Sequence, residues 1–322
     1  MKILVVGGAG YIGSHMVKYL SRRGHAVTVL DDLSTGHRDA VIGAELVVGS
    51  LADRALLDQL LSQGGFDGVM HFAASSLVGE SVADPAKYYR NNVAGTQNLL
   101  DAMREHGPQC FIFSSTAAIF GNPVSELIDE EHPKAPINPY GRSKLMVEQM
   151  LADYDAAYGL RSSCLRYFNA AGADPEGELG ERHDPETHLI PLVLQAASGR
   201  RSHISIFGDD YDTPDGTCIR DYIHVEDLCE AHMLALQRLL EGGASRAYNL
   251  GNGNGFSVAQ VIEAARAVTG QPIPAEKAPR RPGDPPRLVA ASARAREELG
   301  WTPRFDALET IIEHAWAVER KS

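Results

Sequence analysis

Residues 2–13, KILVVGGAGYIG, decide the fold of this chain. A short apolar run, Lys2–Val6, leads directly into glycines at three-residue spacing, and an amphipathic stretch at Ile12–Arg23 follows and ends before Gly24. A strand that turns through glycines into a helix lets backbone amides and the helix N-terminus approach a pyrophosphate closely. The sequence therefore predicts a dinucleotide site whose first contacts come from Gly7, Gly10, Tyr11, Ile12 and Gly13.

The next predicted strand, Ala26–Leu30, ends in Asp31 and Asp32. A carboxylate at this strand end, 18 residues beyond Gly13, is placed to accept hydrogen bonds from the adenosine ribose hydroxyls. It also repels a 2′-phosphate, so the pattern favours NAD over NADP. A turn or helix-capping role for the two aspartates is the alternative.

The first half of the chain alternates short apolar runs with amphipathic stretches, which is typical of a parallel sheet wrapped by helices. Further strands are expected at Glu45–Val48, Gly68–Phe72, Cys110–Phe113 and Ser163–Arg166, and further helices at Ala55–Leu61, Pro85–His106 and Pro139–Tyr158. Beyond about residue 169 the pattern loosens, with loops at 172–187, 208–217 and 278–286.

These patterns predict an α/β fold with a doubly wound parallel sheet of the Rossmann type and a second, smaller substrate domain. We assign residues 1–170 to the NAD-binding domain and expect segments near 222–250 to return to it. Residues 171–322 are assigned mainly to the substrate domain.

Composition excludes several classes of protein. The chain is 44% hydrophobic and 22% charged, as a globular protein is. No apolar stretch approaches the roughly 20 residues that cross a bilayer, and the first apolar run is too short for a signal peptide, so we expect a cytoplasmic protein without membrane partners. The net charge of −12 argues against a nucleic-acid partner. The four cysteines show no metal-ligand spacing, so neither a metal nor a disulfide framework is predicted.

Residues 140–144, YGRSK, place Tyr140 and Lys144 on one face of a predicted helix. A phenol has a pKa near 10 and is a poor base at pH 7, but a nearby ammonium and a positive nicotinamide ring lower that pKa. Tyr140 could then accept a hydroxyl proton while hydride leaves the same carbon for NAD. On its own, this spacing also fits an ordinary pair on a helix surface.

An apolar strand ends in Ser114, Ser115 and Thr116, at the carboxyl edge where open α/β sheets bind ligands. A hydroxyl group there can bond to a substrate oxygen and relay its proton to the tyrosine. A Ser/Thr turn without a ligand is the alternative.

Together, these motifs resemble the extended short-chain dehydrogenase/reductase family. Seven further stretches are similar to the UDP-glucose 4-epimerases within it, at 71–81, 88–100, 139–149, 165–177, 216–228, 248–253 and 280–284. The resemblance implies an NAD-dependent isomerase of galactose metabolism that interconverts UDP-glucose and UDP-galactose at C4, through a transient 4-keto sugar and tightly bound NAD. It also implies a homodimer that pairs through Pro85–His106 and Pro139–Tyr158.

The resemblance assigns the catalytic groups to Thr116, Tyr140 and Lys144. Besides the glycine loop, Asp31 and Asp32, it implies that NAD is bound by Ser50, Leu51, Phe72, Ala73, Ala74, Asn92, Ser114, Tyr140, Lys144 and Tyr167. The residues implied for the UDP-sugar are Thr116, Tyr140, Asn169, His188, Leu189, Arg220, Arg281, Asp284 and Leu288. A planar guanidinium binds phosphate bidentately, which suits the two arginines, although pairing with Asp221 or Asp284 is the alternative.

Three positions depart from the family pattern. Ser50 stands where the family has an aspartate beside the adenine, and Ser76 replaces a lysine that reaches the cofactor in some members. His188 replaces an asparagine near the diphosphate, which keeps a donor and adds pH sensitivity. No departure removes a catalytic group.

The same motifs distinguish this chain from proteins with other functions. A 4,6-dehydratase of this family carries an Asp-Glu pair after the hydroxyl run, where this chain has Ala117 and Ala118, and a decarboxylating relative carries a glutamate near Ala118. A binding module without catalysis is expected to lose Tyr140 or Lys144. In the family, the position seven residues after Arg281 limits the C2 substituent, and a tyrosine there excludes N-acetyl groups. Leu288 at that position leaves UDP-N-acetylhexosamines open as substrates, unless it packs in the core as part of a strand at Leu288–Ala290.

Overall fold

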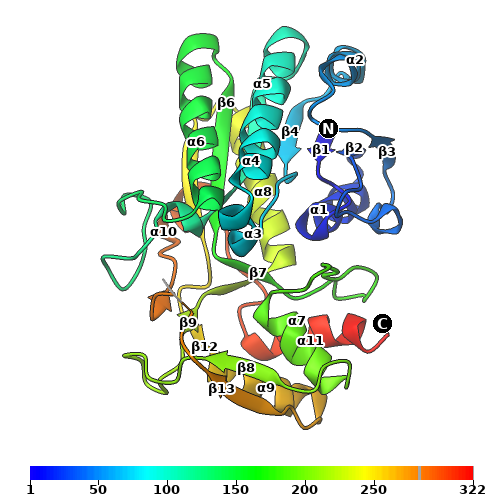
Figure 1. The fold of residues 1–322 in the computed structure, drawn as a ribbon. Coiled ribbons are helices and arrows are strands. Elements are labelled where there is room, and N and C mark those ends of the chain that lie inside the picture. The colour runs from blue at the N-terminus through cyan, green and yellow to red at the C-terminus, as the bar shows by residue number, and fades with distance from the viewer. Residues whose placement is uncertain (282–283, 322) are drawn as a thin grey trace.

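A computed structural model describes residues 1–281 and 284–321 of the chain. Seven parallel strands form one sheet in the order β11-β6-β5-β4-β1-β2-β3 (Figure 1). Their bounds are β1 Lys2–Val6, β2 Ala26–Asp31, β3 Glu45–Val48, β4 Gly68–His71, β5 Cys110–Thr116, β6 Arg161–Tyr167 and β11 Arg246–Leu250. The predicted doubly wound α/β sheet is confirmed.

Helices cover both faces of this sheet because its strands carry apolar side chains on both sides. In β1, Ile3 and Val5 join a core with α1 (Tyr11–Arg22) and α8 (Val225–Leu240), while Leu4 and Val6 join a core on the other face. The second core also contains residues of α2, α5 and α6, whose bounds are Arg54–Gly64, Gly95–His106 and Pro139–Tyr158.

The segment Pro85–His106 is helical over the predicted bounds, but its middle is a π-helix, which the sequence did not predict. The chain forms α4 at Pro85–Tyr88, a π-helical segment η2 at Tyr89–Ala94, and then α5. Apolar periodicity does not reveal a π turn, which needs only one extra residue in the hydrogen-bonded ring and is set by tertiary contacts. In this chain the π segment contains Asn92, which is 2% exposed and bonds to two neighbouring segments.

A smaller layer lies below the sheet in Figure 1. It contains three small sheets, which pair β10 with β7, β9 with β12 and β14, and β13 with β8. Their bounds are β7 Asn169–Ala171, β8 Ile204–Phe207, β9 Ile219–Arg220, β10 Tyr222–His224, β12 Phe256–Ser257, β13 Ala275–Ala278 and β14 Arg287–Leu288. The helices α7 (Leu189–Ala197), α9 (Val258–Thr269) and α11 (Leu308–Glu319) pack together in a separate core.

The remaining helical elements are short: η1 at Arg38–Ala40, α3 at Val78–Ala83, η3 at Ala117–Ile119 and α10 at Ala293–Leu299. The predicted loops at 172–187 and 208–217 contain no helix or strand. The described residues of the loop predicted at 278–286 lie between β13 and β14, although Ala278 is the last residue of β13. None of the helices in the described part of the chain combines the length and apolar character that a membrane-spanning helix needs.

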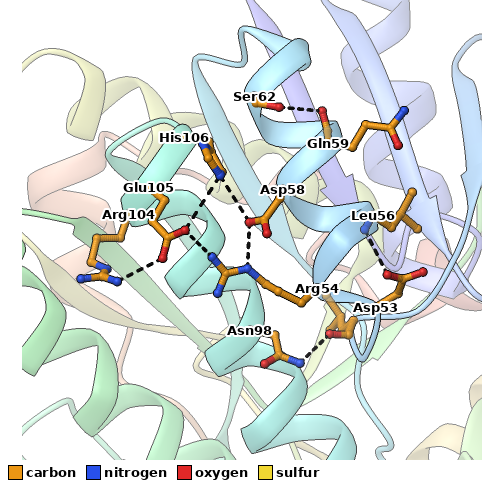
Figure 2. A network of polar contacts seen from close by, with 11 residues as sticks. Asp53, Arg54, Leu56, Asp58, Gln59, Ser62, Asn98, Arg104, Glu105 and His106 are labelled. Carbon is orange, nitrogen blue, oxygen red and sulfur yellow. Dashed lines mark hydrogen bonds and ion pairs between the residues drawn. The ribbon is translucent and has the colours of Figure 1, made fainter.

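A polar network ties α2 to α5 and fixes the segment that follows β3 (Figure 2). Arg54 Nε and Nη2 lie 2.8 Å from Asp58 and 2.7 Å from Glu105. These groups are about a third or more exposed, so the ion pairs contribute little to stability. Asn98 Nδ2 donates to the Leu51 carbonyl oxygen over 3.0 Å, which holds the loop beside the sheet's carboxyl edge.

Candidate active site

The glycine loop between β1 and α1 is packed too closely for side chains at Gly7 and Gly13. A Cβ at Gly7, where φ is +81°, would lie 2.3 Å from the Ala73 nitrogen, and one at Gly13 would lie 2.0 Å from the Gly7 oxygen. A Cβ at Gly10 would meet only the Gly7 oxygen at 3.6 Å, so this glycine leaves space for a ligand.

The start of α1 suits a phosphate group. Gly10 is the N-cap and makes no side-chain cap, and the first turn of α1 has no acidic residue. Backbone N–H groups at a helix start attract anions, so this loop fits the pyrophosphate of a dinucleotide. The Tyr11 hydroxyl already has a partner within the protein, because it donates to the Gly172 carbonyl oxygen at 2.7 Å.

Asp31, at the end of β2, is 9% exposed and holds the glycine loop in place. Its carboxylate accepts hydrogen bonds from the backbone nitrogens of Ala9 and Leu33, both at 2.9 Å. Burial raises the pKa of Asp31, and these two bonds work against that rise. Asp32 is exposed and accepts from the Ser34 nitrogen at 2.9 Å. A carboxylate has about four acceptor sites, so both aspartates keep capacity for ribose hydroxyls.

The ends of β3 and β4 line the same edge of the sheet. Ser50 and buried Leu51 follow β3, and Phe72, Ala73 and Ala74 follow β4. Asn92 ties the β4 end to α6: its Nδ2 donates to the Ser75 carbonyl at 3.0 Å and to Ser143 Oγ at 3.1 Å, and its Oδ1 accepts from the Ser75 nitrogen at 2.9 Å. Sequence reasoning missed Ser75 and Ser143, because their role depends on this contact between distant segments.

Thr116, Tyr140 and Lys144 come together where β5 ends beside the start of α6. Asn138 caps α6 by accepting from the Gly141 nitrogen at 2.8 Å, which fixes the first turn that carries Tyr140. The Thr116 hydroxyl lies close enough to the Tyr140 phenol to lower the pKa of that phenol. The structure therefore unites the three groups that the sequence analysis named.

The sequence predicted that the Lys144 ammonium and a positive nicotinamide ring together lower the pKa of Tyr140, whereas in the protein alone burial has the largest effect on that pKa. Burial raises the pKa of Tyr140, and the nearby Thr116 hydroxyl does not offset that rise. Burial also lowers the pKa of Lys144 to about 7, against a smaller opposing effect of Glu148. In the protein alone, the lysine is therefore only partly charged near pH 7, and desolvation dominates the tyrosine.

Lys144 is 2% exposed and donates to the Ser114 carbonyl oxygen at 2.7 Å, which connects α6 to β5. The Ser114 hydroxyl forms a short hydrogen bond with the Tyr167 hydroxyl at the end of β6. These contacts place the predicted cofactor residues of β5, β6 and α6 next to one another.

A buried ion pair links the elements that carry Thr116, Tyr140 and Lys144. Arg166 Nη2 lies 2.6 Å from Glu148 Oε2, and both side chains are less than 10% exposed. Glu148 Oε1 also accepts from Ser115 Oγ at 2.6 Å. Because β5, β6 and α6 each contribute one member, this set fixes the spacing of the elements that carry Thr116, Tyr140 and Lys144. No sequence pattern predicted this ion pair.

Among the residues predicted to bind the sugar nucleotide, Arg220 and Asp284 form an ion pair with each other. Arg220 Nη1 also donates to the Ile219 carbonyl at 2.8 Å. The Arg281 guanidinium lies 4.0 Å from the centre of the Phe207 ring, a cation–π contact. Pro282 and Gly283, part of the stretch 280–284 that carried the resemblance, lie outside the described residues.

Asp221 does not serve as the arginine partner that the sequence analysis considered. It is fully buried and accepts hydrogen bonds from the backbone nitrogens of Asn252, Gly253 and Ala290, at 2.7–3.1 Å. Its own carbonyl accepts from Asn169 Nδ2 at 2.9 Å. Asp221 therefore organises the backbone around Asn169, and sequence spacing alone could not have found this.

Leu288 is the last residue of β14, so the alternative of a strand at Leu288–Ala290 is not what the structure shows. Ala290 instead forms an isolated bridge with Ile128. Leu288 is partly buried and packs on a small core of Ile119, Phe120 and Ile128. His188 and Leu189 lie at the start of α7, where His188 is the N-cap.

The glycine loop and the Thr116–Tyr140–Lys144 group lie at one carboxyl edge of a doubly wound sheet. This combination defines a nicotinamide dinucleotide-dependent enzyme that acts on an alcohol carbon. The chain belongs to the NAD-dependent epimerase/dehydratase family, whose model matches residues 3–251. The cofactor of this family is NAD.

The chain is similar to individual relatives over almost its whole length. The chain is 56% identical to a UDP-glucose 4-epimerase of Halalkalibacterium halodurans, covering 98% of this chain and 95% of the relative. The crystal structure of the Brucella ovis UDP-glucose 4-epimerase in complex with NAD is 53% identical, with a TM-score of 0.97 over 99% of this chain and 98% of that one. A UDP-Glc/GlcNAc 4-epimerase of Campylobacter jejuni is 44% identical, with a TM-score of 0.88, covering 100% of this chain and 99% of that one.

Proposed function

We propose that this chain interconverts UDP-glucose and UDP-galactose by inverting C4 of the hexose, through a transient 4-keto sugar and NAD that stays bound. The observation that carries the proposal is the group of Thr116, Tyr140 and Lys144 beside a glycine loop that fits NAD. Relatives named UDP-glucose 4-epimerase, similar over nearly the full chain, support it.

In the proposed mechanism, Tyr140 accepts the proton of the C4 hydroxyl. Thr116 lies close to the phenol and can relay that proton. Lys144 keeps β5 and α6 in register through the Ser114 carbonyl and supplies positive charge beside the reacting group. When bound, NAD supplies a reversible hydride acceptor for C4 and a positive ring that favours the phenolate.

Inversion at C4 requires the keto sugar to present its opposite face, so the chain must bind the nucleotide firmly and the hexose loosely. Arg220 and Arg281 are proposed to bind the diphosphate, with Asp284 on the uridine ribose and His188 nearby. Arg220 uses two of its five N–H donors on Ile219 and Asp284, which leaves others for phosphate oxygens.

We infer that cofactor and substrate binding divide between residues 1–170 and 171–322, with 222–250 returning to the first unit. Support comes from β11 and α8: β11 pairs with β6 in the main sheet, and α8 packs in the core on one of its faces. The proposed substrate residues Arg220 and Leu288 pair side by side in the smaller sheet of β9 and β14.

A first prediction separates epimerisation from the competing reactions. Incubation of the purified protein with UDP-galactose in D₂O is expected to give UDP-glucose of unchanged mass, with no deuterium at C4 and no stoichiometric NADH, because the hydride leaves and returns within one turnover. Protein purified without added NAD is expected to retain some of it. Product nucleotide sugars are resolved by chromatography and mass spectrometry.

Other outcomes of this experiment would point to other members of the family. Loss of water would indicate a dehydratase, although Ala117 and Ala118 offer no acid or base after the hydroxyl run. Accumulation of NADH would indicate a dehydrogenase. Absence of turnover with retained NAD would support a binding module.

A second prediction concerns the C2 substituent of the sugar. We expect UDP-glucose and UDP-galactose to be the main substrates, with slow turnover of their N-acetylated counterparts. Leu288→Tyr is expected to lower kcat/KM for the N-acetylated pair by about 10-fold or more and to leave the unsubstituted pair nearly unchanged, because the added bulk clashes only with the larger group. Equal loss on both pairs with a lower Tm would mean that Leu288 only packs against Phe120 and Ile128.

The predicted homodimer and cytoplasmic location also stand as proposals. Helix α6 leaves two large apolar side chains exposed, Met146 at 41% and Tyr158 at 52%, which suits pairing with a second copy. Four buried free cysteines are compatible with a reducing compartment. Sedimentation of a single-chain particle at micromolar concentration would exclude the dimer.

A further inference from the structure

The loop between β7 and α7 brings together four side chains that commonly ligate metals: Glu181, His183, Glu186 and His188. One ligand atom from each lies within 4.8 Å of the others. His183 Nδ1 is 3.0 Å from Glu181 Oε1 and 3.7 Å from Glu186 Oε2, and His188 Nδ1 is 2.6 Å and 3.4 Å from the same two carboxylates. A tetrahedral zinc ion with bonds of about 2.0–2.1 Å separates its ligand atoms by about 3.3 Å.

The burial of the four groups suits an ion more than a set of surface ion pairs. The Glu181 and Glu186 side chains are each 6% exposed, whereas His183 and His188 are 30% and 47% exposed. Glu181 Oε1 and His183 Nδ1 are both buried and lie 3.0 Å apart, and Glu181 Oε1 is also 2.6 Å from His188 Nδ1. A cation shared by these atoms would reach them from the more exposed histidine side.

One of the carboxylates is already fixed by the backbone. Glu186 Oε1 accepts hydrogen bonds from the backbone nitrogens of Thr187 and His188, at 2.7 and 2.8 Å. Hydrogen bonds of this kind orient the carboxylate ligands of metal sites.

The four residues also lie against the cofactor loop. The Arg182 carbonyl bonds to His37 Nε2 at 3.0 Å, and the Arg182 guanidinium pairs with both carboxylate oxygens of Asp39 at 2.9 and 3.0 Å. The His183 ring packs edge-on to Tyr11 of α1, with centroids 6.2 Å apart. An ion bound here would tie the 172–188 segment to the segments that border the glycine loop.

We propose that Glu181, His183, Glu186 and His188 form a binding site for one first-row divalent cation, with Zn²⁺ the best fit, that orders the loop beside the cofactor site. Two imidazoles exclude Mg²⁺ and Ca²⁺, which prefer oxygen ligands throughout. Two carboxylates and two neutral imidazoles also balance the charge of the ion. The site shares His188 with the residues proposed near the diphosphate, but zinc binding can be measured without NAD or a sugar nucleotide.

The test is calorimetric titration of ZnCl₂ into untagged protein that has been stripped with EDTA. We expect one site per chain and no such site for MgCl₂. His183→Ala and Glu181→Gln are each expected to weaken zinc binding on the order of 100-fold. His106→Ala is the matched control, because His106 belongs to a surface cluster with Asp58 and Glu105 (Figure 2) and should leave the affinity unchanged.

Thermal unfolding in EDTA shows whether the variants fold. If they melt as the wild-type chain does, while zinc raises the Tm of the wild type and of His106→Ala only, the site is supported. The proposal is overturned if the wild type has no zinc site tighter than about 100 μM, or if His183→Ala and Glu181→Gln bind zinc as the wild type does. Equal loss in His106→Ala would also overturn it, because binding would then be a general property of surface histidines.

Discussion

Tyr140→Phe is expected to lower kcat by about 10³-fold or more while affinity for NAD and for the UDP-sugar stays within about threefold of wild type. The substitution removes only the phenolic oxygen that accepts the C4 hydroxyl proton, and the ring keeps its edge contact with Tyr88 at 6.5 Å. Stopped assays with UDP-galactose measure kcat, and calorimetry measures the two affinities.

Tyr154→Phe is the control for this prediction. Tyr154 lies on the same helix, and its hydroxyl donates to Asp101 at 2.7 Å, away from the Thr116–Tyr140 pair. It should therefore retain wild-type kcat. If Tyr140→Phe also kept a kcat close to wild type, the assignment of proton transfer to Tyr140 would be wrong.

Lys144→Met is expected to lower kcat/KM by about 10²-fold or more, to weaken NAD binding, and to change how stability depends on pH. The activity falls because the ammonium beside the reacting group and the bond to the Ser114 carbonyl are both lost. The stability effect follows from burial, which lowers the pKa of Lys144 from 10.5 to about 7.

The sign of the stability effect is fixed by that depressed pKa. Below pH 7 the folded chain buries a charged ammonium, which costs stability, and the cost disappears as the pH rises from 7 towards 10.5. Relative to wild type, the stability of Lys144→Met should therefore fall by about 2 kcal/mol between pH 6 and pH 9. Urea unfolding at both pH values measures it, with the exposed Lys134→Met as a control that should show no such dependence. A constant difference between Lys144→Met and wild type would show that Lys144 is charged throughout.

The same substitutions separate the two proposals made for this chain. Neither Tyr140 nor Lys144 contacts the Glu181–His188 cluster by any interaction described above, so both variants should bind zinc as the wild type does. Loss of zinc binding would mean that these variants disturb the whole edge of the sheet.

Much of the active site followed from local sequence. The glycine loop, the acidic end of β2 and the hydroxyl end of β5 each depend on neighbours in the chain, because strand and helix periodicities and backbone turns are set over a few residues. The four-residue spacing of Tyr140 and Lys144 likewise needs only a helix, and α6 runs from Pro139 to Tyr158 as predicted.

Other features could be known only from the folded chain, because they depend on contacts between segments distant in sequence. The π segment around Asn92, the Arg220–Asp284 pair and the support of β5 and α6 by Arg166 and Glu148 are of this kind. Ionisation is another, since the spacing of Tyr140 and Lys144 suggested mutual charge effects, whereas their burial decides both pKa values.

The cluster in the 172–188 loop shows how features predictable from local sequence differ from features that depend on the folded chain. The sequence contains Glu181, His183, Glu186 and His188 within eight residues, but this spacing fits no helix or strand and predicted no metal. The fold brings their ligand atoms within 4.8 Å and buries the carboxylates. The sequence by itself determined the sheet, the glycine loop and the spacing of Tyr140 and Lys144, because each is encoded by local periodicity. Only the tertiary structure decided which groups are buried, charged and joined across the sheet, because desolvation and long-range contacts exist only once distant segments have packed together.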